Sequence, residues 1–230
     1  MQWPKRLAQY VLRGRIQAIT VGVLFSVLPL ATWIANVIVA LVTLRLGPKE
    51  GGIVLLWVML PSVILASAGS PLLWLYSIVG NHLLGYVLAL VLYRAASWSL
   101  ILETLLVLGL STVMAVHWIV PNIHELWLNQ LIQQVSLIKE QFGFQVPAAE
   151  FKFFARIITG FQVALLFLGG LWNLWVARWL QASLYNPGQL YPELAIIRLN
   201  KWVSAIIVSW VGFSFLGYKL DKPYFVWQNF

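Results

Sequence analysis

The sequence predicts an all-α protein, a polytopic bundle of six to seven transmembrane helices, and three observations support this fold class. First, 61% of the 230 residues are apolar and 10% are charged, against about one quarter charged in soluble domains. Second, the charged residues form short clusters between long apolar runs. Third, many of the 13 Trp residues lie near the ends of those runs, where indole rings favour the membrane interface. One integral membrane domain over residues 1–230 is expected.

The first apolar run, residues 16–46, has Pro29 near its midpoint. A continuous helix of this length would reach about 46 Å, whereas the hydrocarbon core is about 30 Å thick. Proline bends or breaks a helix because it lacks a backbone N–H. Two short helices, about 16–29 and 31–46, are therefore favoured over one long tilted span.

The later spans are predicted at about 51–68, 71–93, 98–119, 152–178 and 201–218. Seven spans with a cytosolic N-terminus place ten of the 15 Lys and Arg residues inside, and a single first span places nine there. Because basic loops stay cytosolic, the hairpin is favoured. The ten predicted cytosolic cations are Lys5, Arg6, Arg13, Arg15, Arg45, Lys49, Arg94, Arg178, Arg198 and Lys201.

The turn between the second and third predicted spans has residues that stop one helix and start the next. Gly47 suits a left-handed position after a helix end, and Pro48 suits the first position of the following helix. Glu50 would face the positive end of the new helix dipole. A cytosolic turn is predicted here.

Residues 121–150 form the one long loop, which is predicted to be extracytoplasmic. Leu128, Leu131, Val135 and Ile138 recur at helical spacing with polar residues between them, which indicates an amphipathic helix. This helix would lie flat on the outer leaflet or close over the mouth of the bundle, and the flat position is favoured.

Residues 178–200 are predicted to form a cytosolic elbow. Pro187 disfavours helical geometry in the residue before it, and Gly188 suits the third position of a type II turn, so the helix should end near Asn186. A structural elbow is favoured, and a surface that binds a partner is the alternative.

Polar side chains at bilayer depth are candidates for ligand binding, because burying them in lipid is costly. Helix–helix hydrogen bonds are the more ordinary role, and ligand binding would require these residues to converge on one cavity. The candidates are Asn36, Asn81, His82 and Gln162 near the midplane, and Asn173 closer to the cytosol.

Two features are candidates for docking a partner protein. Small residues four positions apart lie along one stripe of the first helix, where another helix can approach closely; internal packing is the alternative. The elbow supplies the second surface. The candidate docking residues are Ala18, Gly22, Ser26, Arg178, Tyr185 and Asn186.

The composition leaves little for catalysis. The chain has no Cys, which excludes disulfides, thiolate nucleophiles and Cys-based metal sites. Asp221 is the only Asp, so a Ser-His-Asp triad is not expected, and no H-E-x-x-H or G-x-S-x-G motif occurs. Neither an enzyme, a metal nor a cofactor is predicted. The net charge of +8 is attributed to topology and anionic lipid, and not to nucleic acid.

The run Ala177 to Gly188, followed by Glu193-Leu194 and Arg198-Leu199, resembles the YybS-like family of bacterial multi-pass membrane proteins across most of the chain. That family has no established activity. The resemblance therefore implies a location, the bacterial inner membrane with a cytosolic N-terminus, and not a reaction.

More loosely, the first half is similar to the S-components of energy-coupling-factor vitamin transporters. Those proteins have small residues four apart on helix 1 for docking the coupling subunit, and a Gly-Pro turn before a Gly-rich third helix, as Gly47-Pro48 and Gly51-Gly52 would form here. The rod-shape membrane protein MreD shares that architecture without transporting a substrate. An apparent seventh span and the lack of a vitamin-binding motif set this chain apart.

These resemblances imply two functions. The first is a small-molecule-binding subunit of an uptake system, with a closed polar cavity among the predicted helices 31–46, 71–93 and 152–178. The second is a non-transporting scaffold that recruits partner proteins, with a solid apolar core and an exposed cytosolic patch at the elbow.

Overall fold

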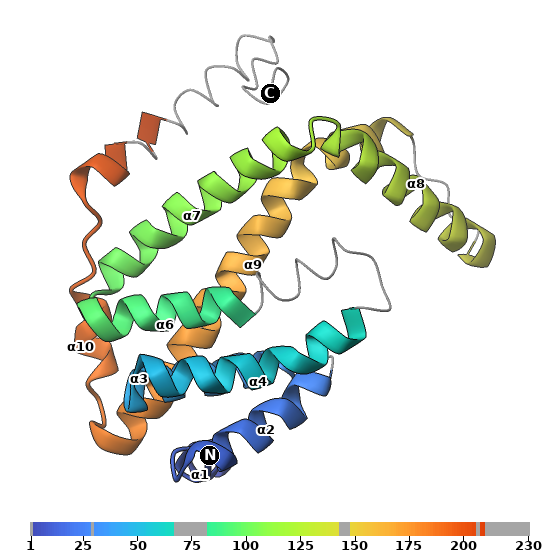
Figure 1. The fold of residues 1–230 in the computed structure, drawn as a ribbon. Helices are drawn as coiled ribbons and strands as arrows, with labels where there is room; N and C mark the ends of the chain where they lie inside the picture. The colour runs from blue at the N-terminus through green and yellow to red at the C-terminus, as the bar shows by residue number, and fades with distance from the viewer. Residues whose placement is uncertain (1, 29, 67–81, 143–147, 206–207, 210–230) are drawn as a thin grey trace. The chain divides into compact units, whose positions relative to one another are not determined.

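The structure is a computed structural model that describes residues 2–28, 30–66, 82–142, 148–205 and 208–209. The described chain is helical and has no strand, which confirms the all-α prediction (Figure 1). The helices are α1 (Trp3–Val11), α2 (Arg15–Val27), α3 (Thr32–Leu46), α4 (Pro48–Ala66), α6 (Leu84–Ala95), α7 (Trp98–Ile119), α8 (Ile123–Phe142), α9 (Ala148–Tyr185) and α10 (Leu190–Ala195).

The chain divides into two compact units, and α7 and α9 each run from one unit into the other. Unit 1 comprises Met1–Glu103 and Leu166–Leu199, and unit 2 comprises Thr104–Leu165 and Asn200–Phe230. The prediction of one membrane domain is not tested by this division.

Two described helices are long and apolar enough to cross a membrane, Trp98–Ile119 and Ile157–Tyr185. Three further apolar helices, α2, α3 and α6, are shorter. Six to seven spans are therefore not confirmed. Most of the predicted span 201–218, and residues 71–81 of the span 71–93, lie outside the described residues.

The run 16–46 forms two helices, because α2 ends at Val27 and α3 begins at Thr32. The two helices pack against each other and against α4. Residues 35–44 of α3 are all buried, since α2, α4 and α6 pack around this helix. α3 is therefore the core of unit 1.

The α3–α4 turn lies at the predicted residues, although the ψ of 170° at Gly47 is not that of a left-handed helical position. Gly47 has a positive φ of 97°, α4 begins at Pro48, and Glu50 lies in its first turn. Gly51 lets α4 approach α3 closely, because a Cβ at this position would lie 2.9 Å from the backbone Cα of Thr43. A side chain at residue 51 would therefore push the two helices apart.

Two of the later helices match the predicted ranges. α7 spans 98–119 as predicted, and α8 is the helix expected within 121–150. α9 runs from Ala148 to Tyr185, so the helix extends beyond the predicted span 152–178 at both ends. The elbow proper therefore begins at Asn186, where the sequence predicted that the helix would end.

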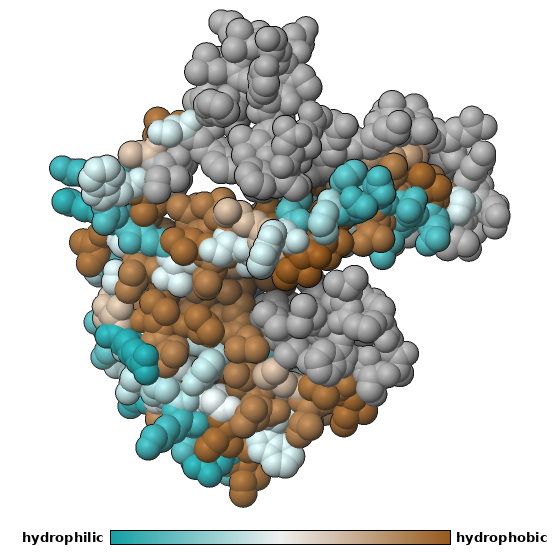
Figure 2. Space-filling view, turned by 45° about the horizontal axis from the view of Figure 1, so that its top comes forward, coloured by the Kyte–Doolittle hydropathy of each residue, from teal (hydrophilic) through white to brown (hydrophobic). Residues whose placement is uncertain are grey.

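Many large apolar side chains are exposed, including Trp118 at 86%. Figure 2 shows apolar residues over much of the visible described surface. Exposed apolar area of this extent is rare on soluble monomers and is typical of interaction or membrane surfaces. In unit 1 the exposed set includes Leu24, Leu30, Leu56, Ile64, Leu168 and Trp172.

Candidate functional site

Three helices of unit 1 bring a chain of polar side chains into the apolar core. His82 Nδ1 lies 2.7 Å from Asn36 Oδ1, and Ser62 Oγ lies 3.0 Å from His82 Nε2. His82 is 1% exposed and Asn36 is 3% exposed. Because an amide oxygen only accepts, Nδ1 carries the proton. A neutral ring then accepts at Nε2 from the Ser62 hydroxyl, so one tautomer satisfies both contacts.

The positions of these residues follow from the helix packing. Asn36 lies in the buried stretch of α3, Ser62 follows Pro61 in α4, and His82 lies just before α6. Gly85 of α6 faces Asn36 of α3, since a Cβ at residue 85 would be in ordinary contact with the Asn36 Cβ at 3.9 Å. Two of the predicted ligand residues therefore bond to each other.

The remaining predicted ligand residues are Asn173, Gln162 and Asn81. Asn173, on α9, is 6% exposed, and its Oδ1 has no hydrogen-bond partner in the described part of the chain. Gln162 belongs to unit 2 and is half-buried. Asn81 lies outside the described residues. Within unit 1, the described residues thus pair Asn36 with His82 and leave the Asn173 oxygen without a hydrogen bond.

The stripe of small residues on α2 faces the interior of unit 1. Ala18, Gly22 and Ser26 are buried, and a Cβ on Gly22 would lie 2.7 Å from Val58 Cγ2 of α4. This is the internal packing that was the alternative to a docking face. A partner at this stripe would have to displace α4.

The helix ends at one side of unit 1 are held together by polar contacts. Arg15, at the start of α2, binds Glu50 of α4 through Nε at 2.8 Å and Nη2 at 2.6 Å. The Tyr86 hydroxyl of α6 donates to the Pro48 carbonyl at 3.0 Å. The backbone N–H of Arg198 donates to Ser99 Oγ, near the start of α7, at 3.0 Å.

We call this region the cationic end, because it gathers nine Lys and Arg residues. Its acidic residues Glu50 and Glu193 are both in ion pairs. The hydrogen bond from Arg15 lowers the pKa of Glu50, so this carboxylate stays ionised. The nine cations are Lys5, Arg6, Arg13, Arg15, Arg45, Lys49, Arg94, Arg178 and Arg198.

Within the cationic end, the elbow is tied to its neighbours. Arg178 of α9 donates from Nε to Glu193 of α10 at 3.0 Å and from Nη2 to the other carboxylate oxygen. The Arg45 guanidinium lies 3.7 Å from the centre of the Tyr185 ring, within the distance of a cation–π contact. Gln181 Nε2 donates to the Leu44 carbonyl at 3.1 Å, so α9 is joined to the end of α3.

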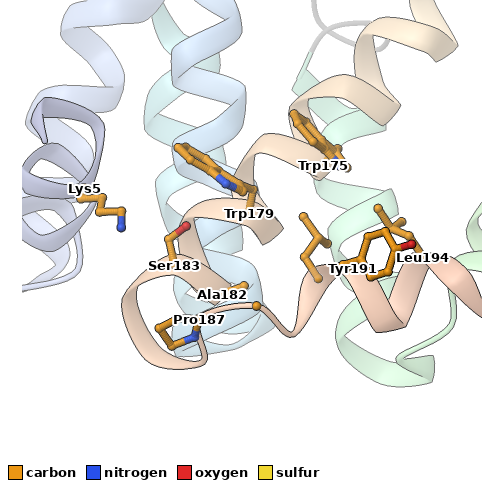
Figure 3. Close-up of a pocket in the computed structure, with 10 residues that line it drawn as sticks. Lys5, Trp175, Trp179, Ala182, Ser183, Pro187, Tyr191 and Leu194 are labelled. Carbon is orange, nitrogen blue, oxygen red and sulfur yellow. The ribbon is translucent and has the colours of Figure 1, made fainter. Parts of the chain in front are cut away.

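A pocket of about 380 Å³ opens beside the elbow (Figure 3). Figure 3 shows Lys5 reaching from α1 toward Trp179 and Ser183, with Tyr191 and Leu194 of α10 across from them. Its walls are mainly aromatic and aliphatic. The lining residues are Lys5, Trp175, Trp179, Ala182, Ser183, Pro187, Gly188, Leu190, Tyr191 and Leu194.

The predicted docking residues of the elbow have different environments. Arg178 is half-buried and engaged with Glu193, Tyr185 is exposed but supports Arg45, and Asn186 is exposed. Arg178 and Tyr185 therefore have structural roles here, which the favoured interpretation of the elbow expects.

Sequence reasoning missed several residues of this site. Ser62 and Lys5 were not singled out, and Glu193 was noted only as part of the family resemblance. Ser62 could have been found because it is a hydroxyl residue that follows Pro61 within an apolar run. Glu193 could have been found because it is the single acidic residue of the basic segment 178–200. In the described residues no three His, Cys, Asp or Glu gather to hold a metal.

Comparisons of the chain with protein-family models, with curated proteins and with solved structures found no match. The resemblances stated from the sequence stay predictions.

Proposed function

We propose that the chain is a multi-pass protein of the bacterial inner membrane whose cationic end faces the cytosol. Two helices of sufficient length, exposed apolar side chains and nine clustered cations support this placement. Basic residues at membrane-span ends stay on the cytosolic side. The short helices α2, α3 and α6 would then be shielded by their neighbours within the bundle.

Within that membrane, the proposed function is a non-transporting scaffold that recruits a cytosolic partner through the elbow. The observation that carries the proposal is the solid core around α3, in which residues 35–44 are buried and Asn36 and His82 satisfy each other. A transporter would need such side chains available for its substrate. The exposed residues of the elbow, among them Asn186, would then meet the partner.

Photo-cross-linking in native membranes tests the scaffold proposal. A photoreactive residue replaces Asn186 on the elbow, and the same residue replaces Lys49 as a control, since both positions are exposed at the cationic end. The expected result is a discrete adduct with a second protein from position 186 and none from position 49. Identical patterns from both positions, or no adduct, would count against a scaffold.

Small-molecule binding is the second candidate, and Asn173 favours it. A buried amide oxygen without a partner costs about 1–3 kcal/mol, and a donor group of a bound molecule would remove that cost. A density map of the purified protein distinguishes the candidates. Density for a small molecule within hydrogen-bond distance of Asn173 would favour binding, whereas a single water or close packing at this position would favour the scaffold.

A further inference from the structure

The pocket beside the elbow has the two surfaces that an amphiphile needs. Lys5 supplies one positive charge, Ser183 a hydroxyl and Trp179 an indole N–H, while Trp175 and Leu194 supply apolar surface. None of its lining residues is acidic. The volume of about 380 Å³ falls within the roughly 300–1,000 Å³ of small-molecule pockets.

Lys5 is the cation that can bind an anion in this pocket. Arg178, nearby on α9, is already paired with Glu193, and Lys5 has no acidic partner in the described part of the chain. An ammonium group offers three donors to phosphate oxygens, and hydrogen bonds between ionised groups are about twice as strong as neutral ones.

We propose that this pocket binds the phosphate headgroup of an anionic phospholipid from the cytosolic leaflet. Its phosphate would meet Lys5, Ser183 and Trp179, and the start of its acyl chain would lie along Trp175 and Leu194. The nine cations of the cationic end raise the local concentration of anionic lipid. This inference rests on the proposed membrane placement.

A phospholipid fits the pocket better than a soluble phosphate does, because the pocket walls are mainly apolar. Seven of the ten lining residues are Trp, Tyr, Leu, Ala or Pro, which give a free phosphate no donors apart from the indole and phenol groups. Tryptophan and tyrosine side chains concentrate at the level of lipid headgroups. The apolar surface therefore matches the carbon atoms next to the phosphate.

Native mass spectrometry of the detergent-purified full chain tests the proposal. The protein is titrated with phosphatidylglycerol, with phosphatidylcholine and with inorganic phosphate. We expect a bound phosphatidylglycerol that Lys5→Ala weakens about tenfold, the effect of one charge-assisted hydrogen bond. Lys5→Arg should retain it, and Lys49→Ala, the loss of an exposed charge outside the pocket, should change it less than twofold.

Three outcomes would overturn the proposal. Equal binding of phosphatidylcholine would mean that the headgroup charge is not recognised. Equal weakening by Lys5→Ala and Lys49→Ala would mean diffuse attraction without a site, and displacement by inorganic phosphate would identify a soluble anion as the ligand. Alkaline carbonate extraction of membranes tests the placement separately. A protein released by carbonate would contradict the membrane placement, whereas a retained protein without lipid selectivity would contradict only this inference.

Discussion

At the residue scale, the hydrogen bond between His82 and Asn36 joins two segments that are 46 positions apart in sequence. Both side chains are buried, and the Asn36 Oδ1 and His82 Nδ1 atoms satisfy each other, while His82 Nε2 is satisfied by Ser62. Removing one partner leaves the other buried and unsatisfied, and such a group costs more than the bond itself contributes. The pair therefore fixes how the start of α6 meets α3.

A double-mutant cycle with His82→Leu and Asn36→Leu measures this pair. We expect each single variant to destabilise unit 1, and the double variant to be more stable than the sum of the two losses implies. The coupling should be about 0.6–1.7 kcal/mol, the range for hydrogen bonds between membrane helices. Unfolding by a denaturing detergent in mixed micelles provides the measurement. Additive losses would show that the bond does not couple the helices.

The Arg15–Glu50 ion pair predicts that the stability of the fold depends on pH. The hydrogen bond from Arg15 holds the pKa of Glu50 below its ordinary value of 4.5, so folding favours the ionised carboxylate. The stabilisation is fully present above pH 4.5 and is lost as the pH falls through the lower pKa of the folded state. The effect is small, because the pair is solvent-exposed.

Thermal unfolding of wild type and Glu50→Gln between pH 7 and pH 3 measures this dependence. At pH 7 the wild type should unfold at a higher temperature than Glu50→Gln. This difference in melting temperature should shrink toward pH 3. Glu125→Gln, which removes an exposed carboxylate from α8, serves as the control. A difference in melting temperature that stays constant with pH would contradict the lowered pKa of Glu50.

At the element scale, the contact between α3 and α4 depends on one glycine. We expect Gly51→Ala to destabilise the protein by about 1–3 kcal/mol, because the new methyl group would overlap Thr43. Gly109→Ala in α7 is the matched control, since no atom lies within 4 Å of its Cβ position. That change should be neutral or stabilising by up to about 1 kcal/mol. Equal effects of both variants on the thermal midpoint would refute the close approach.

Helix ends that depend on local chemistry were predictable from the sequence. Pro29 predicted the break between α2 and α3, and Gly47 and Pro48 predicted the turn into α4. Pro187 likewise predicted the end of α9 near Asn186, but the partner of Arg178 was not predicted, because this residue was interpreted as the boundary of a span. In the structure this arginine instead pairs with Glu193, which brings α10 back against the end of the helix.

At the scale of the whole molecule, the proposed topology predicts which positions are accessible from each side. The chain has no native Cys, so single-cysteine variants can be labelled without background. Lys49→Cys should react with an impermeant maleimide only after the cells are opened. Gln130→Cys, on an exposed position of α8, should react in intact cells. Labelling of both positions under the same condition would overturn the topology.

The convergence of polar residues could not be predicted at this scale. Asn36 and Gln162 have similar predicted depths, yet they belong to different units. Hydropathy gives the depth of a residue and not its neighbour, because neighbours depend on how helices far apart in sequence pack. For the same reason, the elbow pocket, which combines Lys5 with residues 175–194, had no signal in the sequence.

The bond from Gln181 to the Leu44 carbonyl spans 137 positions, and this has a consequence for biosynthesis. α2 and α3, with 13 and 15 residues, are only about 20–22 Å long. Neither helix is therefore long enough to cross the hydrocarbon core of a bilayer, which is about 30 Å thick. The end of α9, which joins α3 through Gln181, emerges from the ribosome after more than three quarters of the chain. Under the proposed membrane placement, the early hairpin would first be sheltered by α4 and α6, and the contact from α9 would be added only when translation is nearly finished.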